Sequence, residues 1–79
     1  MEIVLSCTIP GRGLYRITTE TLDRMIAKYL PASVEDLCRE IDRIWSEEWG
    51  EENFTPAIKE IHTVTEALFV LAELNGLGR

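Results

Sequence analysis

Residues 3–17 read IVLSCTIPGRGLYRI, and this stretch decides the fold. In its first half an apolar side chain recurs at every second position, which is the period of a β-strand with one buried face. The segment PGRG at residues 10–13 then supplies a turn, and LYRI at residues 14–17 is a second β-favouring run. The stretch predicts a β-hairpin over residues 1–17. Because two strands alone are only marginally stable in water, we expect the hairpin to pack on helices.

Two helices are predicted directly after the hairpin, over residues 18–30 and 33–46. The first begins where Thr18 or Thr19 can cap free backbone amides. It ends before Pro31, whose ring cannot continue the helical hydrogen-bond ladder. Ser33 opens the second helix, with Asp36 three residues later in a pair that resembles a capping box. The sequence therefore predicts two helices joined by a short turn.

A third helix is predicted over residues 55–75. Thr55 can cap it with Pro56 at the first helical position, and Asn75 with Gly76 supplies a stop signal. Its residues 67–72 are apolar on every side, unlike those of a helix with one solvated face. Either this is the central helix, covered on both sides, or its second face meets a partner. We favour the central helix, because in so small a protein the hairpin can cover the second face.

Size and charge limit the classes of function. The chain has 79 residues, enough for a single domain. Its 14 acidic and 8 basic residues give a net charge of −6, which argues against a general affinity for nucleic acid or anionic membranes. No apolar run approaches the length of a membrane span, so we expect a cytoplasmic protein. Cys7 and Cys38 are interpreted as small buried apolar residues, with a disulfide between them as the alternative.

The sequence contains little that points to catalysis. His62 is the only histidine, and no nucleophile–base motif can be assembled around it. His62 and Glu66 lie one helical turn apart and provide half a metal site, but a second pair of ligands is missing. We therefore expect no enzymatic activity, no metal and no cofactor. Charge is unevenly distributed along the chain, and we expect scattered surface charge, with a modest basic patch of Arg12, Arg16, Arg24 and Lys28 as the alternative.

The order of strand, strand and three helices resembles a winged-helix domain. The residues that carry the resemblance are YRIT at 15–18, ASVEDL at 32–37, and Ala67-Leu68 to Gly76-Leu77. The chain is similar in particular to the RiPP recognition elements of the pyrroloquinoline-quinone peptide chaperone type, which present a precursor's leader peptide to modifying enzymes. Such domains usually have three strands before the helices, whereas this sequence predicts two.

The resemblance implies a non-catalytic adaptor with a protein or peptide partner. The peptide would join the exposed edge of the sheet as an added strand and lay side chains into a groove beside the third helix. At the strand edge, the expected binding residues are Leu14, Tyr15, Arg16 and Ile17. In the groove, they are Thr63, Val70 and Leu74.

Three other functions remain open from the sequence. A small acidic inhibitor or antitoxin-like protein would block a basic nucleic-acid-processing partner through an acidic face, with Glu35, Glu47 and Glu51. A winged-helix DNA-binding regulator is disfavoured, because the third helix holds more acidic than basic residues. In a structural homodimer, the second apolar face of the third helix would pair with its copy.

Overall fold

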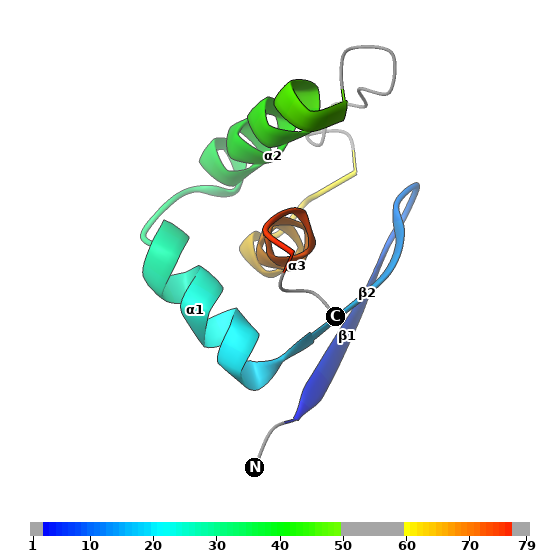
Figure 1. Cartoon of the computed structure of the whole chain (residues 1–79), viewed down its shortest axis with the longest axis vertical. Coiled ribbons are helices and arrows are strands. Elements are labelled where there is room, and N and C mark those ends of the chain that lie inside the picture. The colour runs from blue at the N-terminus through cyan, green and yellow to red at the C-terminus, as the bar shows by residue number, and fades with distance from the viewer. Residues whose placement is uncertain (1–2, 50–59, 77–79) are drawn as a thin grey trace.

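An antiparallel hairpin followed by three helices makes up the structure, a computed structural model that describes residues 3–49 and 60–76 (Figure 1). This confirms the predicted α+β class and the predicted order of elements. The elements are β1 (Val4–Ile9), β2 (Gly13–Thr18), α1 (Thr19–Tyr29), α2 (Val34–Trp49) and α3 (Val64–Leu74).

The hairpin has one buried and one exposed face, as the sequence alternation predicts. Its register runs from Val4 opposite Thr18 to Ile9 opposite Gly13. At the tip, Gly11 has a φ of +83° directly after a proline, the combination that a type II turn requires. The inner face is formed by alternate residues of both strands: Leu5, Cys7, Ile9, Tyr15 and Ile17.

Helix α3 lies at the centre of the protein, with α1, α2 and the hairpin arranged around it (Figure 1). All six residues from 67 to 72 are buried. The rest of the core comes from both strands, α1, α2 and the residue two positions before the cap of α3: Ile9, Ile17, Met25, Leu37, Cys38, Ile41 and Ile61. The structure thus confirms the expectation of a central helix whose two apolar faces are covered within the chain. The central residues of the second face of α3 are therefore not exposed for pairing with a second copy.

Local capping signals set the ends of the first two helices. The Thr18 hydroxyl accepts a hydrogen bond from the Thr21 amide at 3.2 Å, and α1 ends at Tyr29. The Ser33 hydroxyl accepts from the Asp36 amide at 3.2 Å and opens α2. Helix α2 continues to Trp49, three residues beyond the predicted end at 46. The prediction stopped too early, because no proline or glycine interrupts the chain before residue 50.

The third helix begins at Val64, so its predicted start at Thr55 is wrong for the described part, where residues 60–63 are not helical. Thr63 is the cap: its backbone is extended, and its hydroxyl accepts from the Glu66 amide at 3.0 Å. The Glu66 carboxylate in turn accepts from the backbone amide of His62 at 3.2 Å. This reciprocal pair satisfies two amides, as a capping box does. Thr55 itself lies outside the described residues.

A cap substitution tests this helix boundary. We expect Thr63→Ala to lower the free energy of unfolding by about 1 kcal/mol, because an end amide loses its acceptor. Thr65→Ala is the matched control: Thr65 is exposed inside the first turn, where alanine is the better helix former. Urea unfolding followed by circular dichroism measures both. A larger loss for Thr65→Ala than for Thr63→Ala would contradict the observed start of α3.

Candidate functional site

Among the described residues, no strand pairs with the edge of β2 that faces away from β1, and this edge is here called open. The Thr19 amide donates to the Ile3 carbonyl at 3.0 Å, so residues 3 and 19 form a hydrogen-bonded pair. Hydrogen-bonded and non-hydrogen-bonded pairs then alternate along the register. Odd-numbered residues of β2 therefore direct their backbone groups to β1, whereas Leu14 and Arg16 direct theirs outward. The sheet of the described residues has two strands, so no third strand pairs with these groups. Unpaired backbone groups of this kind can receive another strand.

The four residues predicted at the strand edge have different surroundings. Leu14 is 53% exposed and Arg16 is also exposed, both on the outer face of the hairpin. Tyr15 is half-buried and Ile17 is buried, because both belong to the inner face that packs on the helices. Leu14 and Arg16 are thus accessible in both side chain and backbone, while Tyr15 and Ile17 hold the strand in place.

The structure does not bring the predicted groove residues into one open groove. Thr63 caps α3, and Leu74 is the last residue of the same helix, about 16 Å away along its axis. Val70, between them, is 1% exposed and belongs to the core. The sequence pattern assigned the three residues to one helix face, but Thr63 lies before the first turn of α3, and the rest of the chain covers Val70.

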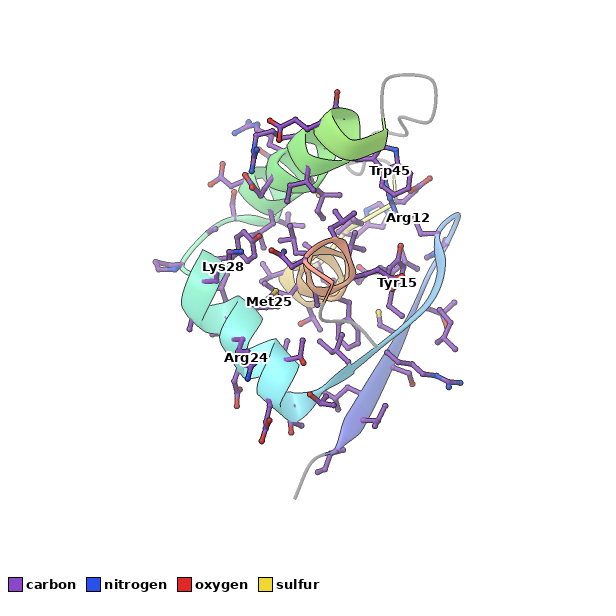
Figure 2. All side chains as sticks on the ribbon, viewed as in Figure 1. Arg12, Tyr15, Arg24, Met25, Lys28 and Trp45 are labelled. Atoms are coloured by element: carbon purple, nitrogen blue, oxygen red, sulfur yellow. The ribbon has the colours of Figure 1, made fainter. Side chains whose placement is uncertain are left out.

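A buried ion pair lies at the tip of the hairpin. The Arg12 Nε lies 2.6 Å from the Glu60 Oε2, and the two side chains are 6% and 18% exposed. The guanidinium also lies over the Trp45 ring, 5.6 Å from its centroid (Figure 2). A cavity of about 210 Å³ is lined by these three residues together with Gly11 and Tyr15. Arg12 is therefore not part of a surface basic patch, which corrects that interpretation of the sequence.

This ion pair, with Trp45, fastens the hairpin tip to α2 and to the segment before α3. A buried guanidinium needs a carboxylate close by, and the tryptophan face adds a favourable cation–π contact. Gly11 allows the close approach, because a Cβ at this position would lie 2.9 Å from the Glu60 Oε1. Sequence reasoning missed the pair, since its two residues lie far apart in the chain and neither belongs to a periodic pattern.

The cysteines and Glu66, the remaining candidates for reactive or metal-binding groups, do not form a site together. Burial raises the pKa of the Cys7 and Cys38 thiols, which favours the less reactive neutral form, and both are free rather than joined in a disulfide. Glu66, which with His62 would provide half a metal site, accepts a hydrogen bond from the His62 amide at the start of α3. Within residues 3–49 and 60–76 there is no group of three or more potential metal ligands. None of the helices in these ranges is long and apolar enough to cross a bilayer.

The predicted acidic face is only partly visible. Glu35 is exposed on the first turn of α2. Glu47 is paired with Arg43 at 3.0 Å, so part of its charge is neutralised on the same helix. Glu51 lies outside the described residues. Pairing with Arg43 thus lowers the free negative charge that Glu47 adds to this face.

Removing the Glu60 charge tests the role of the buried ion pair. We expect Glu60→Gln to lower the free energy of unfolding by about 3 kcal/mol, because the Arg12 guanidinium stays buried without this carboxylate. Glu47→Gln removes the same charge from an exposed pair and should change stability by less than about 1 kcal/mol. Urea unfolding of both variants makes the comparison. Equal, small effects would show that the buried pair does not fasten the hairpin tip.

Alkaline unfolding tests the environment of Tyr15. Burial raises the pKa of its hydroxyl, and the nearby Arg12, which is hydrogen-bonded to it, opposes the rise. The unfolded chain therefore releases this proton more readily, so stability is lost as the pH rises past about 10. We expect Tyr15→Phe to lose less stability than the parent chain between about pH 8 and pH 11 in urea titrations. An identical pH dependence would contradict the raised pKa.

Comparison with known proteins adds no relative to this picture: the chain matches no family model, no curated protein and no solved structure. The hairpin therefore provides the features that bear on function: the open edge of β2, and a tip that the Arg12–Glu60 pair attaches to the helices.

Proposed function

We propose that the protein is a non-catalytic adaptor that binds an extended peptide as an added strand on the open edge of β2. The observation that carries the proposal is the outward-facing backbone of Leu14 and Arg16, next to side chains that are themselves exposed. Strand addition takes its affinity from main-chain hydrogen bonds and its specificity from alternate side chains. The leader peptide of a modified precursor, the ligand implied by the resemblance, is of this kind.

The outer face of β2 defines the chemistry of the peptide. In an added strand, every second side chain lies on the same face as Leu14 and Arg16. An acidic residue opposite Arg16 gains a cross-strand charge pair, and an apolar residue near Leu14 covers an exposed side chain. We therefore infer a preference for a segment in which acidic and apolar residues stand two positions apart.

Helix α3 supports the fold rather than the contact with the peptide. Its six central residues are buried, and its only charged residues are Glu66 and Glu73. A recognition helix in a DNA groove needs an exposed and preferably basic face. These properties favour the peptide over DNA as the partner, and they assign specificity to the hairpin.

A proline scan of the hairpin tests strand addition. Ser6 and Arg16 face each other in the register, and each directs its amide to its own open edge. Proline is tolerated where the amide faces solvent, so either substitution should leave the hairpin folded. We expect Arg16→Pro to weaken a peptide selected from a random decamer library by roughly tenfold or more, because a main-chain bond is lost and the ring obstructs the edge.

The matched variants separate the backbone from the side chain. Ser6→Pro, on the opposite edge, should bind the selected peptide as the parent chain does. Arg16→Ala should bind the selected peptide more tightly than Arg16→Pro does. A new library selection with Arg16→Glu should yield peptides with basic rather than acidic residues. Fluorescence anisotropy measures affinity, and circular dichroism checks folding. Strand addition at β2 would be refuted by equal losses for Ser6→Pro and Arg16→Pro, or by selection of no peptide.

A further inference from the structure

The second open edge of the hairpin has a chemistry of its own. Strand β1 has the sequence VLSCTI and contains no charged residue and no proline. The ladder to β2 leaves the backbone groups of Val4, Ser6 and Thr8 directed outward, and all three side chains are exposed. Proteins usually protect such an edge with lysine, proline or a bulge. An unprotected, uncharged edge favours pairing with another strand.

We propose that this edge pairs with β1 of a second copy, antiparallel, about a two-fold axis that passes between the two copies of Ser6. In this register Ser6 faces Ser6 of the partner subunit, and Val4 faces Thr8 of the partner subunit. The outward amides and carbonyls of both strands then meet as hydrogen-bonded pairs. The result is a four-stranded sheet in which both β2 edges stay open.

The same arrangement on β2 is disfavoured, which makes β1 the edge for the second copy. The middle outward residue of β2 is Arg16, so a two-fold axis there would place two arginines opposite each other. Like charges directly opposite are destabilising, whereas two serines are not. The two edges therefore suit different partners: a copy of the chain at β1 and an acidic peptide at β2.

Exposed apolar residues point to the same surface. Among the described residues, the large exposed hydrophobic side chains are Ile3, Val4, Leu14 and Ile26. Val4 and Leu14 belong to the hairpin, and Ile3 directly precedes it. In the four-stranded sheet, Val4 lies beside Thr8 of the partner subunit, which in turn neighbours Leu14 of the partner subunit on β2. Pairing thus gives Val4, which is 65% exposed in the single chain, neighbours on both sides.

The charge distribution allows two acidic chains to meet here. Residues 3–18 contain Arg12 and Arg16 and no carboxylate, although the whole chain has a net charge of −6. Repulsion between the copies therefore comes from the helices rather than from the edge. A single short strand buries less than the 1,200–2,000 Å² or so of a standard interface, so we expect micromolar rather than nanomolar association.

Charge at the two-fold position tests the pairing. Sedimentation equilibrium of the full chain, from low micromolar to submillimolar concentration, should show a concentration-dependent dimer. Ser6→Arg should remain a monomer throughout, because it places two like charges opposite each other. Leu14→Arg is the matched control: it adds the same charge to the same face one strand away, and it should retain the dimer. A monomeric parent chain, or a dimer unaffected by Ser6→Arg, would overturn the proposal.

A cross-link gives a second readout that does not depend on Ser6→Arg folding. Facing residues in a hydrogen-bonded pair have Cα atoms about 5.5 Å apart, within the range that a disulfide spans. Under mild oxidation, Ser6→Cys should form a covalent dimer, whereas Arg16→Cys and the parent chain should not. Dimers of Arg16→Cys in similar yield would contradict the register. Peptide binding is measured separately. Failure of dimerisation at β1 therefore leaves strand addition at β2 standing, and failure of strand addition leaves dimerisation standing.

Discussion

The burial of α3 on every side is the constraint on which the rest of the structure depends. A helix that is apolar all round needs cover from more than one direction, and within residues 3–49 and 60–76 two helices and a hairpin provide it. The inner face of the hairpin must therefore turn toward α3, which leaves its outer face exposed and both of its edges without a paired strand among the described residues. Covering the core thus creates the open edges that support the functional proposals.

The hairpin tip shows how the cover is held in place. A two-stranded sheet has little stability of its own, and the Arg12–Glu60 pair with Trp45 ties its far end to the helical part. An ion pair with little access to water is sensitive to loss of one partner, because a buried charge then remains uncompensated. The hairpin is therefore a firmly attached platform, and an edge that must receive a strand benefits from such rigidity.

The two open edges differ mainly in one cross-strand pair. Ser6 and Arg16 face each other in the register, one neutral and one charged, each at the middle of its own edge. This single difference favours self-pairing on one side and an acidic peptide on the other. The two proposals are compatible, because a sheet extended at β1 still ends at β2 on both sides. A dimer would present two peptide edges and add avidity to a weak contact.

Local patterns in the sequence determined the hairpin and the ends of α1, together with the start of α2. Alternation, the turn segment at 10–13 and the caps Thr18 and Ser33 act over a few residues, so they are visible without a fold. Tertiary structure alone decided the partner of Arg12 and the burial of Val70. The physical reason is that these features depend on contacts between segments far apart in the chain. Periodicity along the chain does not predict which of these segments come into contact.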